Sequence, residues 1–389
     1  MTTCNKPATG AASAMYYVEE VTCGVTPISP AWTLLRRTSG NLQLTKDTLS
    51  SNELDGSRDR ADTRLGQNQT SGDIAVEMSF GAHDALYAAL LGNTWTSGTD
   101  QSTLSVDVLA SAKTFTRASG DFTTDYSAGD LVQFPGLTGN NALPFIATTV
   151  TALVITGAAI PDGQLADEST VSTDIEGADY LEIGTTNTSF SILEHYPDLD
   201  SGAGGYILTA GVKFVNLAYN MAVNALNTAT FQTLGLSQDI DASLPAGSTF
   251  PTPTKNEIYS GVDGTILADN VAIGFVTGVD ATTDTESSAQ FELGDNSVSF
   301  IEQGRVLSDL TLSSFFTDFT ELTKFQDEDE VALNLMMQSA DGTLAFAYPR
   351  TVYTSGAPDV AGPGSIVASL AASAFAPTTG TSIKIQRLS

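Results

Sequence analysis

The sequence predicts a mainly β protein with two tandem β-sandwich or barrel domains, each carrying one short flanking helix, plus a small inserted all-β module. Three observations predict this class. Thr, Ser, Gly, Ala and Val dominate, and Gly, Asn or Asp interrupts the short apolar runs about every ten residues. Only two short segments have helical apolar spacing. Segments of the first half also recur, in order, in the second half.

The first helix is expected over residues 82–91 (AHDALYAALL). Leu86 and Leu90 stand one turn apart and so share a face. Gly92 follows directly, and glycine commonly ends a helix. The segment therefore predicts a short helix that packs one side against a sheet.

The second helix is expected over residues 318–326 (DFTELTKFQ). Asp318 followed three residues later by Glu321 resembles a capping box at its start. An apolar stripe runs along one face, and we expect it to pack in a core. The stripe consists of Phe319, Leu322 and Phe325.

The two halves are similar in sequence just before each helix. Residues 45–51 (TKDTLSS) match residues 282–288 (TTDTESS) at an offset of 237 (47 to 284). Residues 73–76 (DIAV) match residues 309–312 (DLTL) at an offset of 236 (73 to 309). Each half thus predicts the order strand, loop, strand, helix, as expected of an internal duplication.

A weaker similarity continues after the helices, from residues 205–207 to residues 342–344. Residues 99–172 have no counterpart in the second half, and their alternating apolar and polar residues favour an all-β insertion. Three prolines between residues 244 and 256 indicate a semi-rigid linker. We therefore divide the chain into a discontinuous first domain (1–98 with 173–243), an inserted module (99–172), a linker (244–256) and a second domain (257–389).

The chain is strongly acidic. It has 16 Lys and Arg against 45 Asp and Glu, a formal net charge of −29 at pH 7. A protein that clamps nucleic acid must neutralise phosphates with a positive surface, so this class is excluded. A negative wall would instead repel a passing duplex and let it slide.

The sequence offers little catalytic chemistry. The two histidines, His83 and His195, stand in unrelated contexts, and we interpret both as ordinary surface or packing residues. No phosphate-binding loop, zinc-hydrolase motif or serine-hydrolase motif occurs. We therefore expect no enzymatic activity, no catalytic residues and no cofactor.

Metal and disulfide sites are not favoured either. The acidic runs 198–202 and 327–330 could bind calcium or supply a glycosidase pair, but neither has EF-hand spacing, so solvated loops are favoured. Cys4 and Cys23 are too few for a disulfide framework or a zinc site with four cysteine ligands, and we expect free thiols. The first twenty residues lack a signal-peptide pattern and no apolar run is long enough to span a bilayer, so we expect synthesis in a cytoplasm.

The basic residues are concentrated, because six of the 16 fall between residues 36 and 64. Residues 52–68 connect two predicted strands through a loop far longer than a hairpin requires. A loop of mixed charge could dock on an acidic patch of a neighbouring copy and set its register. The predicted contact residues are Asp55, Arg58, Asp59, Arg60, Asp62 and Arg64.

Several segments, taken in order, carry a family resemblance. They are residues 17–27 (YVEEVTCGVTP), Trp32, the strand and long loop at 41–68, residues 309–312 (DLTL), the helix at 319–325, residues 340–342 (ADG), residues 348–350 (YPR) and the segment 377–385 (PTTGTSIKI). With this order and extent, the chain resembles the major tail tube protein of long-tailed, non-contractile (siphovirus-type) bacteriophages.

The resemblance implies that inner strands of neighbouring copies join into a continuous barrel through which double-stranded DNA passes. Single tube domains of such phages form hexameric rings, so two fused domains imply a trimeric ring with pseudo-sixfold symmetry. The inner strands would lie near residues 42–44, 74–80, 271–279 and 309–316, and the loop 52–68 would contact the next ring or subunit. We would place the inserted module on the outer surface.

The resemblance also implies a location in the virion tail and further partners, namely the tape measure, tail terminator and distal tail proteins. Two other classes stay open from the residues alone. One is a β-rich baseplate, fibre or adhesin protein that binds a host-surface glycan. The other is a carbohydrate-active enzyme with paired carboxylates, for which no motif is present.

Overall fold

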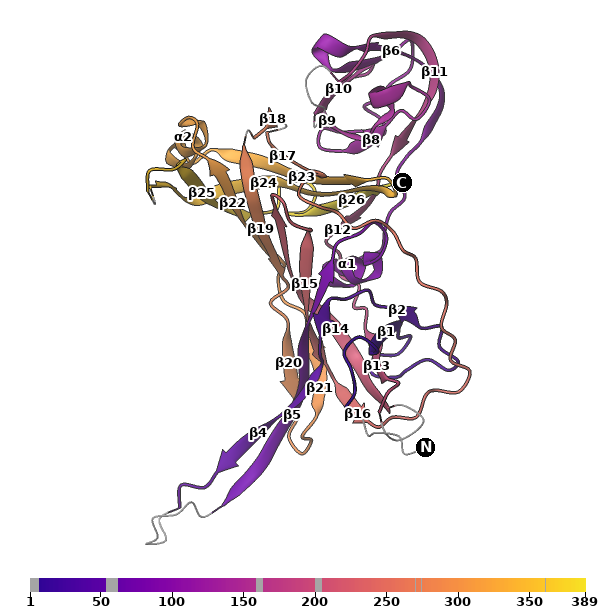
Figure 1. The fold of residues 1–389 in the computed structure, drawn as a ribbon, viewed down its shortest axis with the longest axis vertical. Helices are drawn as coiled ribbons and strands as arrows, with labels where there is room; N and C mark the ends of the chain where they lie inside the picture. The colour runs from indigo at the N-terminus through magenta and orange to yellow at the C-terminus, as the bar shows by residue number, and fades with distance from the viewer. Residues whose placement is uncertain are drawn as a thin grey trace.

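A computed structural model describes residues 7–53, 62–158, 164–199, 205–269, 271–273, 275–360 and 362–389 (Figure 1). In these residues the fold is mainly β, as predicted, and the α-helices are α1 (Asp84–Leu91) and α2 (Thr320–Asp327). Both predicted helices are confirmed to within two residues at each end. Gly92 ends α1 in the left-handed conformation (φ 62°), and its N–H bonds to carbonyls of the last turn.

The strands of the first half lie before and after α1 in the sequence, and strands from the two sides pair with each other. They are β1 (Ala14–Glu19), β2 (Thr33–Leu34), β3 (Ser39–Gly40), β4 (Gln43–Ser50), β5 (Thr63–Glu77), β12 (Asp179–Glu182), β13 (Phe190–Tyr196), β14 (Gly205–Ala222), β15 (Thr228–Gly235) and β16 (Ser237–Ile240). The long strand β14 pairs with β13 and β16 in its first part and with β15 in its second part. It therefore belongs to both layers of a sandwich.

A closed barrel is inserted between α1 and β12. Its strands are β6 (Gln101–Leu109), β7 (Thr114–Arg117), β8 (Leu131–Gln133), β9 (Phe145–Val150), β10 (Val154–Ala158) and β11 (Glu168–Gly177), and two short 3-10 helices (Ala110–Ala112, Gly139–Ala142) connect some of them. The stacked rings of Phe115, Phe134 and Phe145 lie in its core. The barrel docks on β26 (Lys384–Leu388) of the second half through an ion pair of Lys384 with Asp130 (2.7 Å) and the side-chain amide of Gln386.

The second half repeats the plan of the first. Its strands are β17 (Gly264–Ala268), β18 (Val271–Ala272), β19 (Val276–Asp284), β20 (Ser288–Phe291), β21 (Val298–Glu302), β22 (Leu307–Phe315), β23 (Glu330–Ser339), β24 (Gly342–Asp359), β25 (Val367–Ala374) and β26 (Lys384–Leu388). Six strand pairings correspond between the halves. The pairs β1–β13, β4–β5, β5–β15, β13–β14, β14–β15 and β14–β16 match β17–β23, β19–β22, β22–β25, β23–β24, β24–β25 and β24–β26.

The irregularities of the strands repeat as well. The register of β14 against β15 shifts between Phe214 and Asn216, and that of β24 against β25 shifts between Tyr353 and Ser355. The structural offset of these strands is therefore 139 (214 to 353), whereas the sequence similarity suggested 137. For β5 and β22 it is 238 (77 to 315) rather than 236. A slip of two residues keeps every side chain on its face, so the burial pattern alone could not reveal it.

The helices differ in their surroundings. Helix α1 has five buried residues and packs in the core, whereas α2 has none. The expected core packing of the α2 stripe is therefore only partial: Leu322 and Phe325 are half-buried, and Phe319 is 69% exposed. The expected capping box is also incomplete. Asp318 does accept the N–H of Thr320 (2.8 Å), but Glu321 binds Lys324 and the Tyr353 hydroxyl instead of closing the box.

Candidate channel-lining sheet and its open edges

Two strand pairings join the halves, β12 with β26 and β14 with β19, and we call the second of them the internal seam. Residues Asn216 to Ala222 of β14 pair antiparallel with Asp284 to Gly278 of β19. The seam makes a single sheet across the molecule, in the order β4, β5, β15, β14, β19, β22, β25 and β24. The central strands of this sheet run side by side through the middle of Figure 1.

One face of this sheet is the apolar core. Alternate side chains along each strand are buried, which is the pattern of a sheet with one solvated face. They include Ile74, Val76, Leu217, Tyr219, Phe231, Val279, Ala281, Leu310, Leu312, Leu370 and Ala372. The Tyr219 and Tyr348 hydroxyls hydrogen-bond each other (2.8 Å) in this core.

The opposite face is polar and acidic. Paired rows across the sheet place six carboxylates on it, namely Asp73, Glu77, Asp280, Asp284, Asp309 and Asp359. Between them stand mostly small or amide side chains such as Asn216, Ala218, Thr230, Thr282 and Ser369. In the described rows that hold these carboxylates there is no Lys or Arg side chain. The face therefore carries a field of one sign and has no anchor for a phosphate.

Hydrogen bonds order part of this face. The Asn220 amide donates to Asp280 Oδ1 (2.7 Å) across the internal seam. The Ser373 hydroxyl donates to Asp309 Oδ1 at the same distance. Both carboxylates are thus held in place by neutral donors.

Each of the four predicted inner segments contributes residues to this sheet, but none lies in it over its full length. Residues 43–44, 74–77, 276–279 and 309–315 lie in it, but 271–273 precede β19, and in the described chain β18 pairs with β17. Sequence reasoning did not assign β14, β15, β24 and β25 to this sheet. The signal for two of them was length, because β14 and β24 each run for 18 residues.

The sheet ends in two open edges. In the described chain β4 pairs with β5 alone, and residues Ser355 to Asp359 of β24 pair with β25 alone. Unpaired strand edges of this kind are templates for another chain.

The expectation of a loop over residues 52–68 is wrong at its end, because residues 63–68 belong to β5 and pair with β4. The strand β4 and the first part of β5 form a hairpin that projects from the sheet (Figure 1). We call this hairpin the arm. Arg64 Nε donates to Asp62 Oδ2 (3.3 Å), and both side chains are largely exposed, at 82% and 61%. Asp55, Arg58, Asp59 and Arg60 lie outside the described residues.

The second half covers the helix of the first half. The Tyr87 ring of α1 meets Phe346 edge to face with centroids 5.9 Å apart. Arg387 of β26 pairs with Asp84 of α1 and with Asp179 of β12 and stacks on Trp95. Burial raises the pKa of Asp84, although the Arg387 guanidinium beside it opposes the shift. In the described residues α2 has no such cover.

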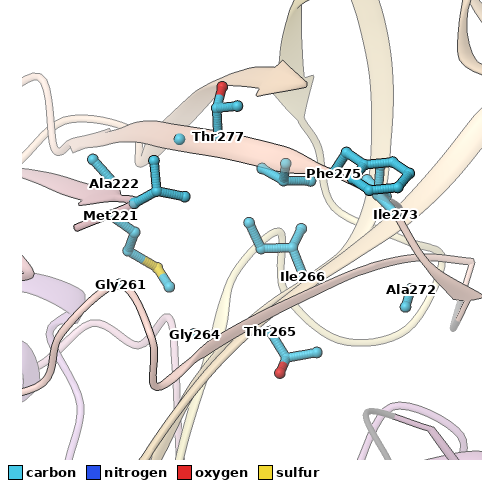
Figure 2. A pocket seen from close by; sticks show the side chains of 13 residues that line it. Met221, Ala222, Gly261, Gly264, Thr265, Ile266, Ala272, Ile273, Phe275 and Thr277 are labelled. Carbon is cyan, nitrogen blue, oxygen red and sulfur yellow. The ribbon is translucent and has the colours of Figure 1, made fainter. Parts of the chain in front are cut away.

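A groove of about 240 Å³ lies at one end of the internal seam. Figure 2 shows its apolar lining, which includes Met221, Ile266, Ile273 and Phe275. Strands of both halves contribute to the lining, and no titratable side chain is part of it. Among its described lining residues, the groove therefore offers mainly apolar contact surface.

The histidines lie apart from the sheet face. Burial under α1 lowers the pKa of His83 to about 4, and its Nε2 lies 3.1 Å from the Arg36 carbonyl oxygen. His195 stacks on Tyr206 with centroids 4.5 Å apart. The described residues contain no cluster of three or more His, Cys, Asp or Glu side chains that could hold a metal ion. Cys23 is a free, exposed thiol, and Cys4 lies outside the described residues.

No helix among the described residues is long and apolar enough to span a membrane. A family model described as "Phage tail tube protein" matches residues 10–374, nearly the whole chain. No curated protein matches the sequence.

Proposed function

Because the chain belongs to the phage tail tube protein family, we propose that it closes into rings that stack into the hollow tail tube, through which phage DNA passes. The role is structural, its place is the virion tail, and it requires no cofactor. The observation that carries this proposal is the internal seam together with the two open edges.

The internal seam is a template for a contact between copies. In the seam the second part of β14 pairs with β19. The corresponding elements of the other half are the second part of β24 and the strand pair β3 and β4, and these are the open edges. Pairing β24 of one copy with β4 of the next would repeat the seam and leave no edge unpaired.

Helix α2 supports the same contact. The second half covers α1 through Phe346 and Arg387. By the repeat, the first half of the next copy would cover α2, which keeps Leu322 and Phe325 half-exposed. One head-to-tail contact would therefore satisfy an open edge and a poorly covered helix together.

A head-to-tail contact must either close into a ring or continue as an open helix. With two equivalent halves in each chain, three chains would give six similar domains around the axis. The sheet would then close into a barrel whose acidic face lines the channel. Such a lining repels the phosphate backbone of a duplex and favours rapid, sequence-independent passage.

The remaining parts have outer roles in this proposal. The arm would reach the next ring, with Asp62 and Arg64 and the neighbouring residues Asp55, Arg58, Asp59 and Arg60 as contacts. The barrel of β6 to β11 docks on β26, away from the acidic face, and would decorate the outside of the tube. Tape measure, tail terminator and distal tail proteins are the further partners that a tail tube requires.

The test is cryo-electron microscopy of polymer grown from the purified chain. We expect hollow tubes whose rings contain three chains, with six similar domains around the bore. Rings of six chains would mean that only one half of each chain lines the channel. Failure to polymerise under any condition would instead favour a baseplate or adhesin role.

A further inference from the structure

The open edge at β4 contains a residue whose backbone is bound by side chains instead of by a strand. Leu42 donates its N–H to Glu194 Oε1 (3.2 Å), and its carbonyl oxygen accepts from Gln238 Nε2 (2.9 Å). Leu42 lies in the break between β3 and β4 and is only 6% exposed. Its two partners come from β13 and β16, in the other layer of the first half.

These backbone groups of Leu42 point away from β5, toward the open edge. Asn68, which stands opposite Lys46, donates its N–H to Asn296 rather than to β4. The Lys46 and Asn68 pair is therefore not hydrogen-bonded, and Lys46 directs its own backbone groups outward. Because the direction of the backbone N–H and carbonyl groups alternates along a strand, these groups of Leu44 and Leu42 also point outward.

The internal seam shows which residue would face Leu42 in a neighbouring copy. Ala281 pairs with Tyr219 in the seam. Strand pairings make Leu42 the counterpart of Ala281, at an offset of 239 (43 to 282), and Pro358 the counterpart of Tyr219, at an offset of 139. Leu42 of one copy would thus stand opposite Pro358 of the next.

That pairing would be incomplete without help. The seam bonds from Thr285 N–H to the Val215 carbonyl and from Val223 N–H to the Thr277 carbonyl belong to the same alternate row as Tyr219 and Ala281. Residues of this row exchange two bonds, one in each direction. Proline has no N–H, so Pro358 could not donate to the Leu42 carbonyl oxygen.

The two halves differ at this point and at its supports. Gln238 has Ile383 as its counterpart in the second half, because Ile240 faces Ile207 as Ile385 faces Phe346. Glu194, which also faces Ile207, has Leu335 as its counterpart. In the second half, where the seam strand β14 supplies an N–H, the supporting position is therefore the apolar Ile383. In the first half, which would face proline, it is the amide donor Gln238.

We infer that Gln238 is a specificity-determining residue of the junction between copies, where it donates to the Leu42 carbonyl oxygen the hydrogen bond that Pro358 of the neighbouring copy cannot donate. This inference rests on the proposed ring closure. Pro358 makes the β24 edge a poor partner for an arbitrary strand, since any partner residue opposite it keeps an unpaired carbonyl. Only an edge with its own donor at that position, as here, keeps this carbonyl oxygen paired.

The test compares Gln238→Ile, Pro358→Ala and the double variant, with Gln164→Ile on the exposed surface of the insertion as the matched control. Critical concentrations are measured by light scattering and unfolding of the free chain by denaturant. In Gln238→Ile the Leu42 carbonyl is left unpaired in the junction, so we expect a critical concentration about tenfold higher. Pro358→Ala restores an N–H, so the double variant should return to within about twofold of the wild-type value. Gln164→Ile should polymerise as the wild type does.

The outcomes separate this inference from the proposed function. Normal polymerisation of Gln238→Ile, or a defect that Pro358→Ala leaves unchanged, overturns the role of Gln238 while the tube stands. Absence of any polymer from the wild type overturns the proposed function and this inference with it. A cryo-electron microscopy map of the tube supplies an independent reading, because Leu42 must face Pro358 of the adjacent copy.

Discussion

The two halves share six strand pairings but face different surroundings, and the comparison shows which features belong to the fold and which belong to an exposed edge. Strand β19 is unbroken where it pairs with β14, whereas its counterpart is divided into β3 and β4 by a break at Leu42. Helix α1 is buried under the second half, whereas α2 has no buried residue. Among the described residues, each difference occurs where an element of one half is covered by the other half and its counterpart is not.

The largest effect is expected from blocking the open edge at β4. In Leu44→Pro the outward N–H is removed and the proline ring hinders an approaching strand, so tubes should be absent at concentrations at which the wild type polymerises completely. The free chain should unfold within about 1 kcal/mol of the wild type, because edge strands tolerate proline. Electron microscopy and denaturant unfolding measure the two effects. Leu44→Val, which keeps the N–H, is the control, and normal tubes from Leu44→Pro would show that β4 stays unpaired.

A matched pair of helix variants should sharpen the comparison. Leu86 of α1 and Leu322 of α2 stand at the same helical position, 236 residues apart, but Leu86 is fully buried and Leu322 only half-buried. We expect Leu86→Ala to lower the free energy of unfolding of the free chain by about 3 kcal/mol and Leu322→Ala by about 1 kcal/mol. If a neighbouring copy covers α2, the difference between these two losses of stability should be smaller in assembled tubes. Equal losses in the free chain would contradict the difference in burial.

A further expected effect depends on pH and is specific to the first half. Burial lowers the pKa of His83 to about 4, so the unfolded chain takes up a proton as the pH falls below about 6.5 while the folded chain does not. Stability is therefore lost between pH 6.5 and 4, by about 2 kcal/mol at pH 5 relative to pH 7. His83→Gln should remove this part of the pH dependence in thermal unfolding. His195 lies nearer the surface, so His195→Gln is the control and should change the pH dependence of stability less.

Local pattern in the sequence was sufficient for the class of fold, both helices and the order of the repeat. It placed the repeat two residues out of register, because side chains alternate with a period of two and a slip of two keeps the same face. The internal seam could not be predicted, since nothing near Asn216 or Asp284 indicates a pairing between halves. Gln238 and Glu194 also look like ordinary polar positions until the strand pairings show that their counterparts are Ile383 and Leu335.

The strand order of the large sheet has a consequence for the speed of folding. All six strands of the inserted barrel come from one stretch, Gln101–Gly177, and pair within it. The sheet instead joins distant segments. Strand β5, before that stretch, pairs with β15, after it, and β12 pairs with β26 at the end of the chain. Closing such long loops slows folding, so we expect the barrel to form early and the sheet to form late. Until the sheet forms, strands that later pair within one chain have unpaired edges. Two incompletely folded chains could then pair their strands with each other incorrectly.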